Sequence, residues 1–295
     1  MTSIPRVAGF DAGTHDPMPT SLGEALEREA RMYLSERTGS ALAPARTYIV
    51  TDFEYRWHRE EFAKYLVAEG SDTRTEPLWP FHEIVAASWL IMRFRAGEPV
   101  PDILAPVVMA ADTADERAIV EALFADLVAE PFATLVTWGG ETKDLAVLRR
   151  CAATLDLLLP LQLRDGSPHA RNRLDLCRAT TVQAKLVHLP ELAMAVGIPA
   201  KPSPSRAIGR LVEEGRWPCV REQVLADVLT TSVLAVRHLA SHGEVTCDRV
   251  GTMTAIAEAA AGAVPQSAFV KRVFAPWAKA AAVRAKLKGA ILAPV

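Results

Sequence analysis

TYIVTDFE, residues 47–54, is a β-like run that ends in two carboxylates. Its aromatic and β-branched residues are typical of a strand. Successive strand side chains point to opposite faces of a sheet, so Asp52 and Glu54 are expected on the same side. Two carboxylates that converge there repel each other unless a cation or a shared proton offsets the repulsion. The pair therefore favours a divalent metal site, and the alternative is an exposed sheet edge with two solvated acids.

The composition indicates a soluble, globular protein. The chain has 295 residues, of which 50% are hydrophobic, enough for one large domain or two small ones. A net charge of -2 excludes a protein that binds nucleic acid by a strongly basic charge alone. The four cysteines include no Cys-x-x-Cys pair, which argues against a zinc knuckle or a disulfide framework. No apolar leader follows Met1 and no run resembles a membrane span, so a cytoplasmic location without membrane contact is expected.

The chain divides into three parts by pattern. Residues 1–44 form an N-terminal extension, residues 45–240 form the main domain, and residues 241–295 form a C-terminal helical extension of two Ala-rich helices. That extension could pack against the domain or mediate a homodimer contact. Its segment Lys271–Lys288 carries six basic and no acidic residues, which fits either a solvated helix face or a tail that contacts phosphates.

The main domain shows strands first and then an alternation of helices and strands. A three-strand meander is predicted at 47–54, 81–94 and 102–109. It is followed by a helix that opens at Asp112, a strand at 132–138, a helix at 144–159, a strand at 173–177 and helices at 188–197, 208–215 and 220–239. This order predicts an α/β fold with a mixed sheet flanked by helices.

Two further acids lie at chemically suggestive places. Asp144 opens a helix directly after the turn at Gly139-Gly140, where a carboxylate is also an ordinary helix-start residue. Asp227 interrupts the apolar helix 220–239, and a buried carboxylate without a partner is costly. Carboxylates contributed by a strand end, a turn and a late helix are what a two-metal phosphoryl-transfer site requires.

Four segments together resemble a known family. They are Ile49–Glu54, Leu135–Leu148, His188–Pro199 and Ala226–Thr230, and they resemble successive blocks of the DEDD 3′-5′ exonucleases, in particular exonucleases related to the proofreading domain of family-B DNA polymerases. The resemblance covers about residues 45–240 and implies a ribonuclease H-like fold. It also implies hydrolysis of phosphodiester bonds at the 3′ ends of single-stranded DNA or RNA.

The resemblance also implies the metal ligands. Asp52, Glu54 and Asp227 would hold a first ion, and Asp52 would reach a second ion with the help of Asp144. The two ions would be Mg²⁺ or Mn²⁺, which suit oxygen ligands.

The chain departs from the family near its last acid. The family places a Tyr four residues, or a His five residues, before that Asp, whereas this chain has Gln223 and Glu222. Gln223 can hydrogen-bond a water but cannot take its proton, and Glu222 can act as a base only if it is suitably placed. The alternative function is therefore a weakened, exonuclease-like module that binds nucleic acid. Trp57, close to the acid pair, is either a stacking platform for a terminal base or a core or interface residue.

Overall fold

The computed structural model describes residues 45–70, 78–167, 170–181 and 184–292. The predicted N-terminal extension, residues 1–44, lies outside the described residues.

Six strands form one mixed sheet. They are β1 (Arg46–Trp57), β2 (His82–Phe94), β3 (Asp102–Ile103), β4 (Val107–Ala110), β5 (Thr134–Thr137) and β6 (Arg173–Asp175). Their order is β3-β2-β1-β5-β6, with β4 also paired to β2. β2 is antiparallel to β1, β3 and β4, whereas β5 is parallel to both β1 and β6. The sheet confirms the predicted α/β class, a mixed sheet flanked by helices.

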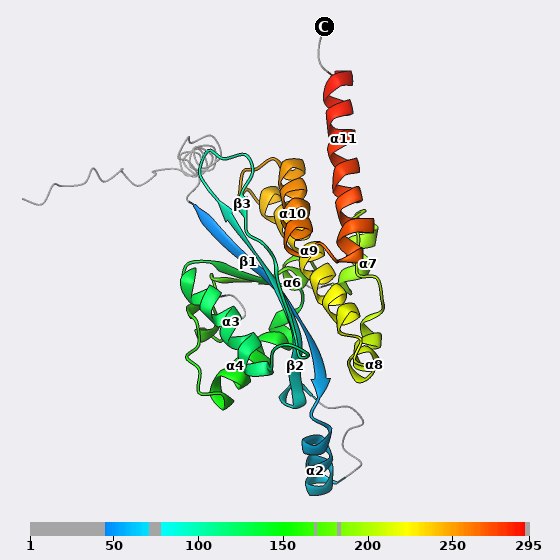
Figure 1. Ribbon diagram of the computed structural model, residues 1–295. Coiled ribbons are helices and arrows are strands. Elements are labelled where there is room, and N and C mark those ends of the chain that lie inside the picture. The colour runs from blue at the N-terminus through cyan, green and yellow to red at the C-terminus, as the bar shows by residue number, and fades with distance from the viewer. Residues whose placement is uncertain (1–44, 71–77, 168–169, 182–183, 293–295) are drawn as a thin grey trace, which may run out of the picture. The chain divides into compact units, whose positions relative to one another are not determined.

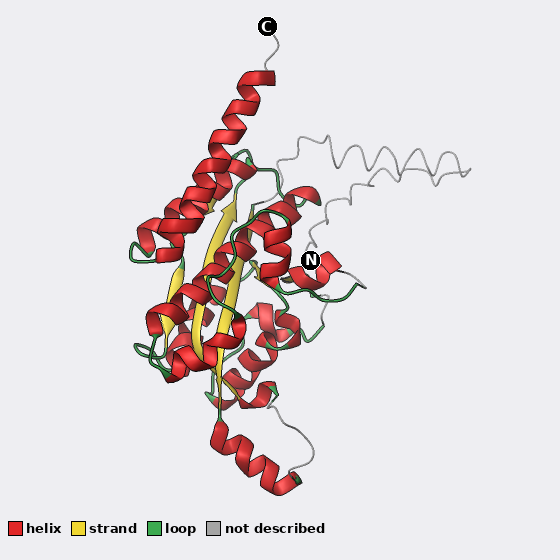
Figure 2. Ribbon diagram, turned by 90° about the vertical axis from the view of Figure 1, so that its right-hand side faces the viewer, coloured by secondary structure: helices red, strands yellow, loops and turns green. Residues whose placement is uncertain are grey.

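Helices lie on both sides of this sheet (Figures 1 and 2). The α-helices are α2 (Arg59–Glu69), α3 (Glu116–Ala129), α4 (Asp144–Thr154), α5 (Leu161–Arg164), α6 (Leu176–Thr181), α7 (Leu189–Ala195), α8 (Ile208–Glu213), α9 (Trp217–Ser241), α10 (Arg249–Ala263) and α11 (Ala275–Leu292). Short turns of other helix types are η1 (Trp79–Phe81), η2 (Gly140–Thr142), η3 (Ser205–Ala207) and the π-helical η4 (Val270–Phe274). One hydrophobic core joins the sheet to α3 and α4, and another joins it to α9 and α10.

Side chains alternate between the two faces of the sheet along β1, and this alternation decides which helix each of them contacts. Tyr48 and Val50 belong to the core beneath α9, whereas Ile49 and Phe53 belong to the core beneath α3 and α4. Because the side-chain period of a strand is two, the even-numbered residues continue toward α9. Asp52 and Glu54 therefore lie on the side of the sheet that α9 covers.

α9 is the central helix of the second core. By length and composition it could cross a membrane, since an 18-residue window has a mean hydropathy of 1.3. However, 72% of that window is buried inside the protein, as expected for a helix in a hydrophobic core. The helix extends the predicted range, 220–239, at both ends.

Three α-helices of the described residues were not predicted, and one of them is the short α5, which lies beyond the end of the helix expected at 144–159. α2 follows β1 where only a polar stretch was expected, and none of its residues is buried, so no apolar stripe marks it in the sequence. α6 replaces the end of the strand predicted at 173–177. The chain turns there because the Asp175 carboxylate accepts hydrogen bonds from the backbone N–H groups of Cys177 and Arg178, as a helix cap does.

The two C-terminal helices occur as predicted on either side of Pro265. Met253 and Ile256 of α10, Phe274 of η4 and Ala278 of α11 are buried in the core that contains α9. The C-terminal segment thus packs against the domain, and a dimer contact through it stays a prediction.

Candidate metal centre

Asp52 and Glu54 occupy the second half of β1, next to an irregularity of the sheet. Asp52 pairs with Ser88 and Glu54 with Ala86 of β2, and the register then shifts before Tyr55. Bulges of this kind re-aim side chains and are frequent beside active sites. Both acids keep the same face, as the spacing of the sequence predicted.

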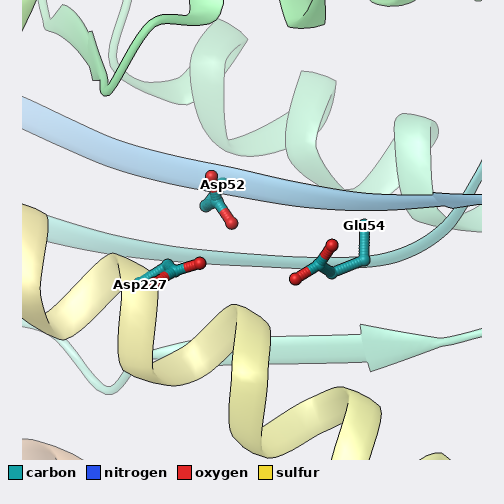
Figure 3. Close-up of side chains that lie close together, drawn as sticks. All are labelled: Asp52, Glu54 and Asp227. Atoms are coloured by element: carbon teal, nitrogen blue, oxygen red, sulfur yellow. The ribbon is translucent and has the colours of Figure 1, made fainter. Parts of the chain in front are cut away.

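Asp227 reaches these two acids from α9. Figure 3 shows the three carboxylates pointing toward one another, two from β1 and one from the helix. One oxygen atom of each residue lies within 4.8 Å of the corresponding oxygen atoms of the other two. Asp52, Glu54 and Asp227 are called the acid triad below.

The acid triad is short of partners for its negative charge. Burial, followed by the charges of Asp227 and Glu54, raises the pKa of Asp52 well above its ordinary range. Burial also raises the pKa of Glu54 to about 8. Glu54 Oε1 and Asp227 Oδ1 are buried and have no hydrogen-bond partner among the described residues.

These features fit a divalent cation. Buried oxygens without donors are costly unless something compensates them, and carboxylates are ligands that Mg²⁺ and Mn²⁺ prefer. The acid triad therefore offers three ligands for one ion.

A lysine that the sequence analysis missed lies in the same place. Lys201 Nζ donates a hydrogen bond of 2.6 Å to Asp227 Oδ2, and the exposed fractions of the two side chains are only 8% and 6%. Burial lowers and the charges of Asp227 and Glu54 raise the pKa of Lys201, and the net change is upward. The side chain is thus a cation inside the site. Its only signal in the sequence is a lysine between prolines, in the segment Pro199–Pro204, which does not reveal a contact with α9.

Asp144, the fourth predicted acid, is positioned by the turn that follows β5. Gly139 has φ of 75°, a left-handed conformation that favours glycine, and a Cβ atom on Gly140 would lie 2.6 Å from Thr137 Oγ1. The Asp175 carboxylate accepts hydrogen bonds from the backbone N–H groups of Gly139 and Glu141, at 2.9 and 3.2 Å. Asp175 therefore orders the turn, in agreement with a structural role.

Asp144 is not part of the acid triad. Its Oδ1 atom accepts a hydrogen bond of 2.7 Å from the Tyr55 hydroxyl and lies 4.0 Å from Lys143 Nζ. Tyr55 follows Glu54 on β1 and packs with the core beneath α3 and α4, the side on which α4 begins. The charge of Asp144 still acts on the acid triad, since Asp144 is one of the charges that raise the pKa of Asp52.

The two residues expected near the attacking water differ in their surroundings. Gln223 is fully buried one helical turn before Asp227, and neither its side-chain nitrogen nor its oxygen has a hydrogen-bond partner among the described residues. The Glu222 carboxylate instead accepts hydrogen bonds from the backbone N–H groups of Ala268 and Phe269 and from Ser267 Oγ. The structure does not bring Glu222 to the acid triad, because both of its oxygens are held at the segment before η4.

A cleft of about 880 Å³ opens where Glu54 of the acid triad reaches the surface. Glu54 and Tyr55 line it from β1, Arg206 and Arg210 from η3 and α8, and Lys143 from the turn before α4. The lining has five acidic and five basic side chains, so charge alone does not select a polyanion. Trp57 also lines the cleft and is 46% exposed, which gives a flat aromatic surface close to the acids.

The comparisons with known proteins concern the fold. No family model and no curated protein matches the chain. Among solved structures, the chain is similar to the family B DNA polymerase from the hyperthermophilic archaeon Pyrobaculum calidifontis, with 14% identity and a TM-score of 0.46, over 74% of this chain and 29% of the polymerase. It is also similar to E. coli exonuclease I in complex with a dT13 oligonucleotide, with 13% identity and a TM-score of 0.40, over 66% of this chain and 41% of the exonuclease.

A third structure is the zinc-bound form of the E. coli exonuclease I complex with single-stranded DNA. It has 13% identity and a TM-score of 0.40, over 68% of this chain and 41% of that protein. The chain thus spans less than half the length of the proteins it is similar to.

Proposed function

We propose that this chain is a metal-dependent 3′-5′ exonuclease that hydrolyses phosphodiester bonds at single-stranded nucleic-acid 3′ ends. The observation that carries the proposal is the acid triad, in which carboxylates from β1 and α9 converge and two buried oxygens have no donor among the residues that the structure describes. The order of acids along the chain, which the family resemblance implied, supports the same activity.

Each acid has a role in this proposal. Asp52, Glu54 and Asp227 would hold one Mg²⁺ or Mn²⁺ ion, and Asp144 together with Asp52 would serve a second. When bound, such ions neutralise the charge of a phosphodiester and make water easier to ionise near neutral pH. The Tyr55 hydroxyl donates a hydrogen bond to Asp144 and would orient this acid toward the second ion.

The cleft would receive the end of the nucleic acid. Trp57 offers a ring face for a base, and stacking of this kind tolerates any base sequence. Because Trp57 and Glu54 line the same cleft, a nucleotide stacked there would lie in the cleft that Glu54 of the acid triad also lines. Both single-stranded DNA and single-stranded RNA are proposed substrates, because a stacked base and a metal-bound phosphodiester are common to the two.

The direct test is degradation of single-stranded DNA and RNA labelled at the 5′ end, with Mg²⁺, with Mn²⁺ and with a chelator. Progressive shortening from the 3′ end that needs the metal is the expected result, and Asp52→Asn should abolish it. The matched control is Asp156→Asn, because Asp156 is exposed and has φ of 54°, which asparagine also tolerates. Failure of the wild-type protein to shorten either substrate with either metal would contradict the proposal.

A second candidate function is an exonuclease-like module that binds single-stranded nucleic acid but cuts it slowly or not at all. The observation that favours it is the place before Asp227, where Gln223 cannot accept a proton and Glu222 is held elsewhere. Fluorescence anisotropy with a labelled oligonucleotide separates the two functions, because the module would bind and leave the strand intact.

If the chain cuts, Gln223→Leu tests whether the amide orients water. The expected result is a lower rate with unchanged oligonucleotide affinity and no loss of stability, because the replacement removes buried polar atoms that have no partners. A rate equal to that of the wild type would exclude a role for Gln223.

A further inference from the structure

Lys201 stands out because a flexible, charged side chain is buried against an acid that the proposed site needs. Both its ammonium group and the backbone of its segment are held by contacts with α9. Its ammonium group donates to Asp227 Oδ2, and the backbone of its segment is fixed to α9 because Thr230 Oγ1 donates to Pro199 O at 2.8 Å. Lysine is rarely buried unless it is paired, so this placement is specific.

The charges of the site explain what Lys201 does. Three carboxylates meet within 4.8 Å, and among the described residues Lys201 is the cation that forms an ion pair with one of them. With all three acids ionised, the lysine leaves an excess of two negative charges, which is the charge of one divalent ion. The two oxygens of Asp227 differ in their surroundings. Oδ2 accepts a hydrogen bond from the Lys201 ammonium group, whereas Oδ1 is buried and has no donor in the described part of the chain.

We infer that Lys201 is a built-in counter-cation of the acid triad, which holds Asp227 in the metal-free protein and opposes the divalent ion that binds beside it. The inference deepens the proposed function and rests on its metal site. A positive charge next to Asp227 offsets the charge of that carboxylate, and the same charge repels an incoming cation. Lys201 is therefore a positioning residue that stabilises the empty site and weakens metal affinity.

Other positive side chains near the site do not share this position. Lys143 Nζ lies 4.0 Å from Asp144 Oδ1 and 4.1 Å from the centre of the Tyr55 ring, and its side chain is 41% exposed. Arg206 lines the cleft but makes no ion pair within the described part of the chain. Lys201 is thus the side chain whose removal changes the charge of the acid triad with least effect on the cleft.

The test is Lys201→Met, which keeps the length of the side chain and removes its charge. It is compared with Lys64→Met, a control on the exposed helix α2 that loses only a surface pair with Glu61. Thermal unfolding is measured with a chelator and with Mn²⁺, and Mn²⁺ binding is measured by calorimetry without nucleic acid. K201M should unfold at a lower temperature in the chelator, bind Mn²⁺ roughly tenfold more tightly or better, and gain more from Mn²⁺ than the wild type.

A second variant separates charge from packing. Lys201→Met combined with Asp227→Asn removes both charges of the pair, so the melting temperature in the chelator should return toward that of the wild type, and this rescue should hold even if K201M alone does not fold. The inference is overturned if K201M binds Mn²⁺ no more tightly than the wild type, or if the double variant is no more stable than K201M.

These measurements are independent of nucleic-acid cleavage. A wild-type protein without nuclease activity, in which K201M still binds Mn²⁺ more tightly, would contradict the proposed function and leave the inference standing. Active wild-type protein with unchanged Mn²⁺ affinity in K201M would do the reverse.

Discussion

The Tyr55 hydroxyl donates a hydrogen bond of 2.7 Å to Asp144 Oδ1, on the face of β1 opposite to that of Asp52 and Glu54. The two residues meet because Tyr55 lies one position beyond Glu54, on the other face of β1, and because α4 begins on that face. Burial raises the pKa of Asp144, whereas Lys143 and the hydrogen bond from Tyr55 lower it. Tyr55 thus keeps a buried acid closer to its ionised form.

Replacement of this tyrosine should therefore weaken any step that needs the ionised Asp144. In Tyr55→Phe the hydrogen bond is lost, the pKa of Asp144 rises further, and a smaller fraction of Asp144 is ionised at a given pH. Loss of a group that orients a metal ligand typically costs tenfold or more, so we expect about a tenfold lower nuclease rate near neutral pH. The acidic limb of the pH–rate profile should move to higher pH.

Tyr48→Phe is the control for this measurement. Tyr48 is buried on the same strand but packs in the core beneath α9, so its variant should keep the wild-type profile. Identical pH–rate profiles for Tyr55→Phe and the wild type would show that the hydrogen bond has no influence on Asp144.

Glu222 should act on stability and not on the reaction. Its carboxylate accepts hydrogen bonds of 2.9 and 2.8 Å from the backbone N–H groups of Ala268 and Phe269, which resembles a helix cap. In Glu222→Gln the free energy of unfolding should fall by about 1 kcal/mol, the usual cost of a lost cap. The cleavage rate per folded molecule should stay unchanged, whereas loss of a general base would lower it about a hundredfold or more.

Urea unfolding and a single-turnover cleavage assay measure the two effects separately. Glu258→Gln, at an exposed position of α10, supplies the comparison for a change of surface charge. A large fall in cleavage rate without a fall in stability would show that Glu222 takes part in the reaction.

The acid triad was predictable because each of its parts leaves a local pattern. The alternation of side chains along β1 places Asp52 and Glu54 on one face. An acid inside a helix as apolar as α9 indicates a buried carboxylate, which needs a partner that compensates its charge. What brings the three acids together is the packing of α9 against the face of β1 that carries both acids. The succession of strands and helices predicted a mixed sheet flanked by helices, but not which helix covers that face. The long elements β1, β2 and α9 were predicted with nearly correct bounds, whereas the strand expected at 102–109 is divided into β3 and β4.

Lys201 and Tyr55 were not predicted because their contacts depend on irregular backbone. Lys201 meets Asp227 only through the path of a proline-rich segment, and no periodicity links residues in such a segment to a helix. The role of Tyr55 depends on the register shift after Glu54 and on the turn at Gly139. For α2 the reason is different: it is a helix without a buried face, so it lacks the pattern by which helices are recognised.

Trp57 should contribute to binding of single strands through stacking. Because the cleft has as many acidic as basic side chains, the affinity should depend on this ring more than on salt. Trp57→Ala should weaken binding of a labelled oligonucleotide about tenfold, as expected for one lost base stack. Anisotropy in a chelator measures this without cleavage. Trp79→Ala, at a residue 38% exposed in η1, is the control, and equal affinities of the two variants would contradict the role of Trp57.

Glu54 should make the stability of the metal-free protein depend on pH. Burial raises its pKa from an ordinary value of 4.5 to about 8, with Lys201 opposing and Asp227 adding to the shift. Below pH 4.5 the folded and unfolded states both hold the proton, so the full stability is present. As the pH rises toward about 8 the unfolded state releases the proton first, and the free energy of unfolding falls until the folded state is also ionised.

Urea unfolding in a chelator at several pH values measures this effect. The free energy of unfolding should decline more steeply with pH for the wild type than for Glu54→Gln, whereas Glu69→Gln on the exposed helix α2 should follow the wild type. Mn²⁺ should reverse the decline at the high end of this range, because metal ligands bind in their deprotonated form. Equal slopes for the wild type and Glu54→Gln would mean that Glu54 is ionised in the folded, metal-free protein throughout, and that the acid triad is compensated by some other group.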